Sequence, residues 1–176
     1  MIAFATVYEK WFKMKGRFSK VYPMLQTGSH APDFSLPDAD MEMFKLSSLK
    51  GKVVVLFFYP KDDTPGCTLE AIEFTDMEEE FARLNTVVLG ISRDDCISHA
   101  AFRDKHGLSV GLLADVEGKV CEKYGVWQEK EFEGMHKMGI IRSTFIIDAS
   151  STVRHALYGV TAKGHAAEIL QLIKEL

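Results

Sequence analysis

A run of six apolar residues, Val53 to Phe58, constrains the fold of this chain more than any other segment. The run reads VVVLFF, is rich in β-branched and aromatic types, and is stopped by Pro60. A strand with one face in water alternates apolar and polar residues, whereas an unbroken apolar strand is buried on both faces. The segment therefore predicts an inner strand of a sheet that is covered on its two sides.

The segments around this strand predict an ordered series of elements. The expected elements are a hairpin over 34–36 and 43–46, a helical turn capped by Ser47 and Ser48, the strand 53–58, a helix 65–84, a strand 86–91, a helix opened by Asp94 or Asp95 and closed by Gly107, a strand 110–115, a short helix 119–125, strands 142–148 and 152–159, and a helix 165–176. Strands alternate with helices early and pair directly late. With right-handed crossovers, this order is typical of a thioredoxin-like α/β fold with a central mixed sheet and flanking helices.

Two segments of different character divide the chain. Residues 1–23 mix aromatic side chains with five basic residues against one glutamate, whereas residues 24–176 carry the pattern of elements. We interpret residues 1–23 as an N-terminal basic and aromatic extension, and residues 24–176 as one domain of ordinary size. The extension is either an amphipathic arm that docks on the body, a partner or an acidic lipid surface, or an accessory tail from an early start codon.

Composition and charge exclude several classes of protein. The net charge of −4 gives no electrostatic reason to expect a nucleic-acid partner. No window approaches the run of about 18 apolar residues that a membrane span requires, and the N-terminus makes a poor secretory signal. The six histidines have no metal-ligand spacing. Three cysteines, an odd number in a chain that needs no disulfides, favour a reducing compartment, so we expect a cytoplasmic protein without membrane contact.

One cysteine stands where a buried strand ends and a helix begins. In the stretch YPKDDTPGCTLEA, Thr64 suits the N-cap and Pro65 the first helical position, so Cys67 is the third helical residue. Free N–H groups and the helix dipole favour a thiolate there, and the thiolate is the nucleophilic form of cysteine. An inert buried thiol is the structural alternative. A C-x-x-C disulfide reductase would need cysteine at position 64, so Thr64 excludes that chemistry.

The same stretch resembles a known family of enzymes. Pro60, Thr64 and Cys67 match the P-x-x-x-T-x-x-C signature of peroxiredoxins, and FFYPKDDTPGCTLEA resembles the peroxiredoxin Q, or bacterioferritin comigratory protein, subfamily. Further matches are APDFSLPD, LKGKVVVLFFYP, VLGISRD, EKYGVW and GIIRSTFIID. The resemblance runs from about Met24 to Leu176. It implies a peroxiredoxin-type thioredoxin fold and an antioxidant, thiol-dependent peroxidase that reduces hydrogen peroxide and organic hydroperoxides.

The resemblance also implies catalytic roles. Cys67 would be the peroxidatic cysteine, which attacks the O–O bond of the peroxide and becomes a sulfenic acid. Arg142 would stabilise the thiolate and the charge that develops as the O–O bond breaks. Glu70, one turn after Cys67, is either the ion-pair partner of Arg142 or a solvated carboxylate. The resemblance calls for neither a metal nor an organic cofactor.

Three further residues would complete the site by the same resemblance. Thr64 would hydrogen-bond the thiolate and the peroxide, and Pro60 would shield the sulfur from water and stray oxidants. The backbone N–H groups of Gly66 and Cys67 would complete the cradle for the peroxide oxygens.

The resemblance does not fix how the sulfenic acid is resolved. Many members of the subfamily carry a second cysteine five residues after the first, or on the next long helix, and here these positions hold Ile72 and Arg103. Cys96 lies two helical turns before Arg103, on the same face, and could act as a displaced resolving cysteine. We interpret Cys121 as structural. The default is a one-cysteine cycle in which an external thiol, such as thioredoxin, is the reductant.

Two other functions stay open at this point. The chain could be a peroxide sensor that passes its oxidation to a client through a mixed disulfide. It could also be a holdase-like binding protein on the same fold, with the N-terminal extension as its contact surface. The subfamily is commonly monomeric, and the aromatic residues of the extension leave a dimer open.

Overall fold

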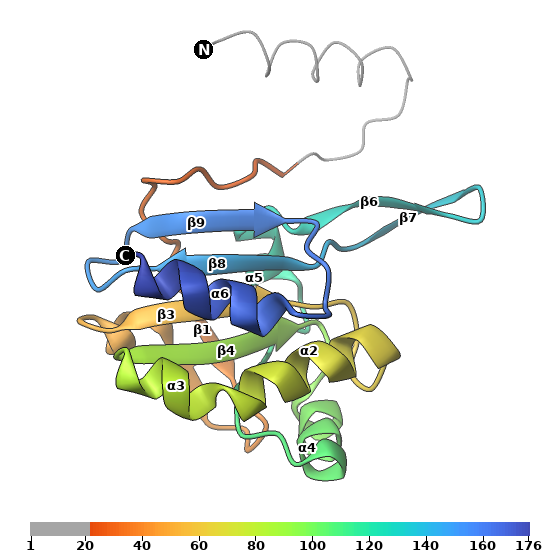
Figure 1. Ribbon diagram of the computed structural model, residues 1–176. Coiled ribbons are helices and arrows are strands. Elements are labelled where there is room, and N and C mark those ends of the chain that lie inside the picture. Colours follow the sequence, from red (N-terminus) through yellow and green to blue (C-terminus); the bar gives the residue numbers. More distant parts are fainter. Residues whose placement is uncertain (1–21) are drawn as a thin grey trace, which may run out of the picture.

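The apolar run forms strand β3 (Val53–Phe58), which lies in the middle of a five-stranded mixed sheet (Figure 1). The structure is a computed structural model that describes residues 22–176, so most of the expected N-terminal extension lies outside the described residues. In chain order, the first elements are β1 (Ser35–Pro37), β2 (Met43–Lys45), the 3-10 helix η1 (Leu46–Leu49), β3, α2 (Pro65–Asp76), α3 (Glu78–Arg83), β4 (Thr86–Ser92) and α4 (Cys96–His106). Those that follow are β5 (Gly111–Ala114), α5 (Lys119–Lys123), β6 (Trp127–Phe132), β7 (Met135–Ile140), β8 (Ser143–Ile147), β9 (Val153–Tyr158) and α6 (His165–Lys174).

The strand order β5-β4-β3-β8-β9 confirms the thioredoxin-like arrangement. Strands β3, β4 and β5 run parallel, with helical crossovers between them, whereas β8 and β9 are antiparallel to their neighbours. The carboxyl ends of β3 and β4 therefore lie at one edge of the sheet. The helices α2 and α4 begin at that edge, which is the usual place for a binding site in an open α/β sheet.

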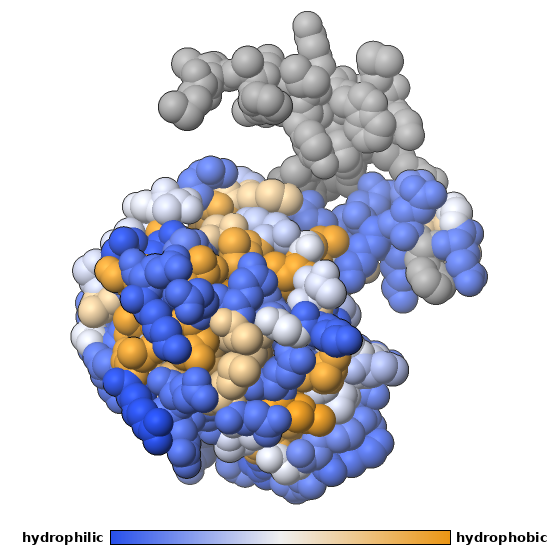
Figure 2. Space-filling view, viewed as in Figure 1, coloured by the Kyte–Doolittle hydropathy of each residue, from blue (hydrophilic) through white to orange (hydrophobic). Residues whose placement is uncertain are grey.

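Alternate residues of β3 feed two separate cores, one on each face of the sheet. Val54, Leu56 and Phe58 pack with the β1–β2 hairpin and α5, while Val55 and Phe57 pack with α2, α3, α4 and α6. Both sets are buried, as the unbroken apolar run predicts. On the face shown in Figure 2, hydrophobic residues are visible between hydrophilic residues of the surrounding helices.

Two predictions about helix ends are confirmed and one is wrong. Asp95 caps α4, because its side chain accepts a hydrogen bond from the backbone N–H of Ser98, and Gly107 ends the helix in the left-handed conformation. Ser47 and Ser48, however, do not cap the short 3-10 helix, since they lie inside it. Asp33 takes that role from 14 residues away, with its carboxylate accepting the N–H of Ser47.

The structure also differs from the expected elements in two places. The predicted helix 65–84 is two helices, because Met77 leaves the helical conformation at ψ 5° and ends α2 before α3 begins. A second hairpin, β6 with β7, was not predicted at all, and it extends away from the main sheet in Figure 1. Within residues 22–176, no helix is both long and apolar enough to cross a membrane.

Candidate active site

Cys67 lies at the start of α2, directly after the loop that follows β3. Thr64 occupies the N-cap position and Pro65 the first position of the helix, so Cys67 is the third helical residue, as expected. The residue is only 1% exposed. The first hydrogen bond into the helix runs from the N–H of Thr68 to the carbonyl of Thr64, at 2.9 Å. The N–H groups of Gly66 and Cys67 come before it and stay available to a ligand.

Arg142 reaches the same point from a distant part of the chain. Strand β8 pairs antiparallel with β3, and its first residue, Ser143, stands opposite Phe58, the last residue of β3. Arg142 therefore sits beside the end of β3, and the N–H of Val160 holds its carbonyl at 3.0 Å. Its Nη2 donates to the Sγ of Cys67 at 3.3 Å. The sulfur of Cys67 is therefore in direct contact with a permanent positive charge.

Glu70 forms an ion pair with Arg142, through Nη1 and Oε2. Its side chain is fully buried, and Oε1 has no hydrogen-bond partner in the described part of the chain. Burial raises the pKa of Glu70 to about 7, although the charge of Arg142 and its hydrogen bond work in the opposite direction. The carboxylate is therefore no solvated surface group. The guanidinium of Arg142 bridges it to the thiol.

Three residues expected in the site have different surroundings. The hydroxyl of Thr64 donates to the carbonyl of Lys61 at 2.9 Å, so the expected side-chain cap of α2 is absent. Pro60 is exposed on the loop before the helix. Gly66 lies against Arg142, because a Cβ built on it would stand 3.2 Å from Nη2. The absence of a side chain at position 66 therefore leaves room for the guanidinium.

Lys130 is a cation near the site that the sequence reasoning missed. It lies on β6, half-buried, and its stem crosses over Gly139 of the paired strand β7. Burial and the charge of Arg142 lower the pKa of Lys130, while Cys67 acts in the opposite direction. Lys130 is therefore within electrostatic range of both residues. The signal in the sequence was weak, because nothing in the run WQEKEF marks the hairpin that carries it.

The other two cysteines have unlike environments. Cys121 is fully buried on α5, and burial together with the Asp115 carboxylate raises the pKa of its thiol far above the ordinary value. Cys96 is partly exposed at the first position of α4. Cys67 and Cys96 stand in the first turns of the helices that follow the neighbouring strands β3 and β4, and both thiols are free. At the position aligned with a second cysteine, Arg103 is ion-paired to Asp40 and Asp104.

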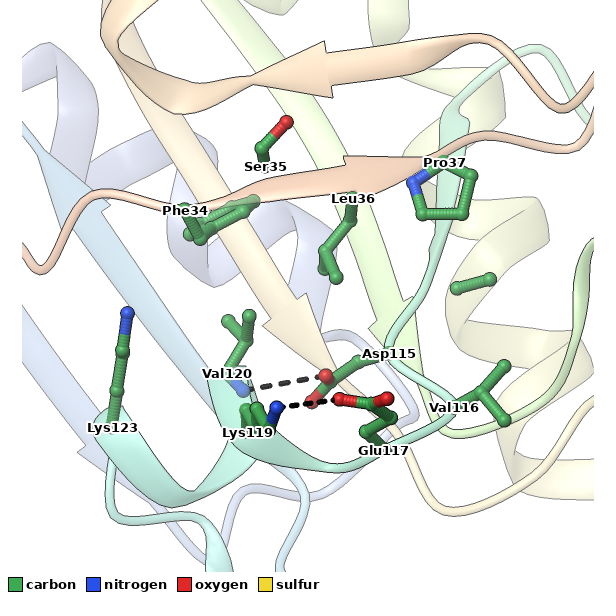
Figure 3. A pocket seen from close by; sticks show the side chains of 11 residues that line it. Phe34, Ser35, Leu36, Pro37, Asp115, Val116, Glu117, Lys119, Val120 and Lys123 are labelled. Carbon is green, nitrogen blue, oxygen red and sulfur yellow. Dashed lines mark hydrogen bonds and ion pairs between the residues drawn. The ribbon is translucent and has the colours of Figure 1, made fainter.

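A pocket of about 360 Å³ lies away from these residues, on the face of the sheet covered by β1 and α5 (Figure 3). Phe34, Leu36 and Val120 form its apolar walls. Asp115 faces it but already accepts the N–H groups of Val120 and Cys121. No cysteine lines this pocket, so it is separate from the thiol chemistry. Within residues 22–176, no three His, Cys, Asp or Glu side chains are grouped so that they could hold a metal ion.

Comparisons with known proteins point in the same direction as this geometry. The model of the AhpC/TSA family matches residues 27–156. Peroxiredoxin Bcp of Bacillus subtilis is 45% identical over 152 residues, which are 86% of this chain and 97% of that protein. A solved mutant of PrxQ from Xylella fastidiosa has a TM-score of 0.83 at 32% identity, and the match covers 87% of this chain and 98% of the other.

A second solved structure carries a statement about activity. It is the bacterioferritin comigratory protein of Xanthomonas campestris, described by its alkyl peroxide reduction activity. The TM-score is 0.77 at 34% identity, over 81% of this chain and 90% of that chain. The residues matched by the family model, 27–156, include both Cys67 and Arg142.

Proposed function

The chain belongs to the AhpC/TSA family as a thiol-dependent peroxidase of its Bcp peroxiredoxin group, and from that premise we propose that Cys67 attacks the peroxide. The observation that carries this assignment is the contact between the Cys67 sulfur and Nη2 of Arg142, at 3.3 Å. Cys121 is instead buried beside the Asp115 carboxylate, which with burial raises the pKa of its thiol. Cys67 is thus the thiol that an arginine contacts directly.

The peroxidatic step transfers two electrons from sulfur to the peroxide. The Cys67 thiolate attacks the oxygen of ROOH that bears hydrogen, so that an S–O bond forms while the O–O bond breaks. The products are a Cys67 sulfenic acid and an alkoxide, which takes a proton from water and leaves as the alcohol. With hydrogen peroxide, the leaving group is hydroxide and the product is water.

Negative charge moves from sulfur to the leaving oxygen in this step, and the residues around Cys67 suit that movement. Arg142 would stabilise the negative charge both on the sulfur and on the leaving oxygen. Its Nη1 is held by Glu70, so the direction of the guanidinium toward Cys67 is fixed. The N–H groups of Gly66 and Cys67 would donate to the peroxide oxygens. The Thr64 hydroxyl donates to the Lys61 carbonyl, and its oxygen has lone pairs left to accept the O–H of the peroxide. Pro60 would limit access from solvent.

The substrates are peroxides, and we infer that hydrogen peroxide and organic hydroperoxides are both accepted. The relative from Xanthomonas campestris is described by alkyl peroxide reduction. The site presents N–H donors and a guanidinium to the O–O group and makes no demand on the organic part. A substrate range set by access to the thiol, and not by recognition of one alkyl group, is therefore expected.

A thiol must regenerate the enzyme, and we propose thioredoxin or a similar external dithiol. Its thiolate attacks the sulfur of the sulfenic acid, so that an S–S bond forms while the S–O bond breaks, and the hydroxide that leaves takes a proton to become water. The second thiol of the reductant then releases Cys67. Cys96 would attack the sulfenic acid in place of the external thiol if the first turns of α2 and α4 moved so that the two sulfurs met. The three cysteines are free, which fits the reducing cytoplasm that we propose for this enzyme, and the resemblance to the subfamily favours a monomer.

Replacement of each cysteine in turn tests the assignment of Cys67. We expect Cys67→Ser to abolish peroxide consumption with dithiothreitol as reductant, whereas Cys121→Ser keeps it within about twofold, because a buried thiol far from Arg142 takes no part. Full activity in Cys67→Ser would overturn the proposal. Peptide mass mapping after one equivalent of peroxide separates the two cycles: a Cys67–Cys96 disulfide indicates internal resolution, and a lone Cys67 sulfenic acid indicates an external thiol.

A further inference from the structure

A buried polar cluster lies behind the Cys67 loop and takes no part in the chemistry described above. At its centre, the carboxylate of Asp62 accepts three hydrogen bonds. The hydroxyl of Tyr59 donates to Oδ1 at 2.7 Å, the hydroxyl of Ser98 to Oδ2 at 2.8 Å, and Nδ1 of His99 lies 2.7 Å from Oδ2. The side chain of Asp62 is 4% exposed and that of His99 is 0% exposed.

The partners of His99 determine how many protons the pair holds. Its Nε2 lies 3.0 Å from the carbonyl of Leu113, which can only accept, so Nε2 carries a hydrogen. Its Nδ1 faces a carboxylate oxygen at hydrogen-bond distance, so a second proton lies between Nδ1 and Asp62. Asp62 and His99 together therefore share one proton beyond that on Nε2. The cluster is neutral as a unit, which is how a buried charge pair avoids a large desolvation cost.

Tyr59 and Asp94 join this pair to the loop and to the next strand. Burial and the charge of Asp62 raise the pKa of Tyr59 well above its ordinary value of 10.0, so the phenol keeps its proton and donates it. The backbone N–H of Asp62 donates to the Asp94 carboxylate at 2.9 Å, and the hydroxyl of Ser92 donates to the same oxygen at 2.6 Å. Loop 59–64 is thus held at its side chains and its backbone.

The contacts of Asp62 with Ser98, His99 and Asp94 run from the loop before Cys67 to the start of α4 and the residues just before it, while His99 is held in turn by Leu113 of β5. A fully satisfied buried network fixes the geometry of the groups that it joins. Here it fixes the loop that sets where α2 begins. The position of the Cys67 sulfur relative to Arg142 follows from the position of that first turn, and a displacement of about 1 Å can cost a reaction about a hundredfold in rate.

We propose that Asp62 and His99 are positioning residues for the peroxide reaction, which hold loop 59–64 on α4 so that the Cys67 sulfur stays at the Arg142 guanidinium. This inference rests on the proposed role of Cys67. Neither residue touches the sulfur or the peroxide, and both act through the loop. Their removal therefore slows the oxidation of Cys67 but does not slow the later attack of an external thiol on the sulfenic acid.

The neighbouring residue Asp63 provides a matched control. Its carboxylate pairs with Lys105 and His106 on the same helix, but these contacts lie at the surface. Its φ of 58° is in the left-handed region, which asparagine also adopts readily. Asp63→Asn therefore changes the same charge one position away without disturbing the backbone or a buried group.

Stopped-flow oxidation by hydrogen peroxide, with dithiothreitol reduction of the sulfenic acid measured separately, tests the proposal on the full chain. We expect Asp62→Asn and His99→Gln each to slow the oxidation of Cys67 about tenfold or more, with a less than additive effect in the double variant. Sulfenic acid reduction should be as fast as in the unchanged protein or faster. Asp63→Asn should stay within about twofold in both steps.

Hydrogen exchange supplies a second readout that does not depend on activity. The amides of residues 62–68 should exchange about tenfold faster in the two variants, while those of β3 and β8 stay unchanged. If either variant fails to fold, Ser98→Ala, which removes one of the three donors to Asp62, should give the same pattern at a few-fold effect. Oxidation within twofold of the unchanged protein, or an equal slowing of both steps, would overturn the inference. Retained activity in Cys67→Ser would instead overturn the proposed function.

Discussion

One guanidinium serves two partners in this site, and the consequences are largest for Glu70. Nη1 of Arg142 pairs with Glu70 and Nη2 contacts the sulfur of Cys67. An arginine can do this because its nitrogens are fixed in one plane, whereas a lysine ammonium has no such fork. Glu70 is fully buried, so its negative charge depends on this one partner. A buried charge with one partner makes the stability of the protein depend on pH.

The free energy of unfolding should therefore fall as the pH rises toward neutrality. Burial raises the pKa of Glu70 from 4.5 to about 7, so the folded protein holds this proton more tightly than the unfolded chain does. The resulting stability is present below pH 4.5 and is lost as the pH rises through about 7. A shift of this size corresponds to about 3 kcal/mol.

Urea unfolding of Glu70→Gln at pH 5 and pH 8 measures this contribution. We expect the variant, which cannot titrate at position 70, to lose less stability between these pH values than the unchanged protein, by about 2 to 3 kcal/mol. Glu79→Gln, with a side chain 90% exposed, is the control and should follow the unchanged protein. The same pH slope in Glu70→Gln and the unchanged protein would contradict the prediction.

At the scale of single residues, the sequence predicts contacts better than environments. A short signature places Cys67 at a helix start, and the resemblance selects Arg142, 75 residues away, as its neighbour. Burial of Glu70 could not be predicted, since it depends on how α2 packs against β8 and α6. The Asp62–His99 pair was missed for the same reason: the two residues lie 37 positions apart, and each looks like a surface residue alone.

Among the elements, Gly90 in the contact between β3 and β4 leaves the space that the packing of α2 on the sheet requires. Gly90 on β4 stands opposite Phe57 on β3, and a Cβ at position 90 would lie 2.6 Å from the ring. The Phe57 ring is stacked on Phe74 of α2, with centroids 4.7 Å apart, so it has no free space to move into. A side chain at position 90 would therefore push the Phe57 ring against α2, the helix that carries Cys67.

Gly90→Ala should destabilise the fold through this clash. We expect the free energy of unfolding to fall by about 1 to 3 kcal/mol, which urea unfolding measures. Phe57→Leu shortens the group that the new methyl would meet, so the double variant should lose clearly less than the sum of the two single losses. Additive losses would show that the strain arises elsewhere.

The elements that the sequence predicts poorly share a physical cause. Thr75, Asp76 and Met77 include no proline or glycine, so the apolar spacing runs through the break between α2 and α3 without a signal. The β6–β7 hairpin has few apolar residues, and its turn at Glu133 and Gly134 uses two positive φ angles that the sequence pair does not announce. Strong apolar strands such as β3 are predicted to the residue, because burial on both faces dictates their composition.

Over the whole molecule, the folded domain begins a few residues before the first residue that the family model matches. The match starts at residue 27, yet the carbonyl of Pro23 lies against Gly125, whose φ of 69° and missing side chain allow this approach. The N–H of Leu25 donates to the Tyr158 hydroxyl at 2.8 Å, and Leu25 packs against the core. We propose that the peroxidase domain starts near residue 22, and that the residues before it are an extension with no part in peroxide turnover.

Two N-terminal truncations, which start four residues apart, test this boundary. A chain starting at residue 22 keeps every core contact described, so we expect its peroxide rate and urea midpoint to match the full chain. A chain starting at residue 26 loses the Pro23 and Leu25 contacts, and its free energy of unfolding should fall by about 1 to 2 kcal/mol while Cys67 still reacts. A loss of peroxide turnover in the first truncation would assign the extension a role in catalysis. Loss of partner binding with intact turnover would give it a separate function.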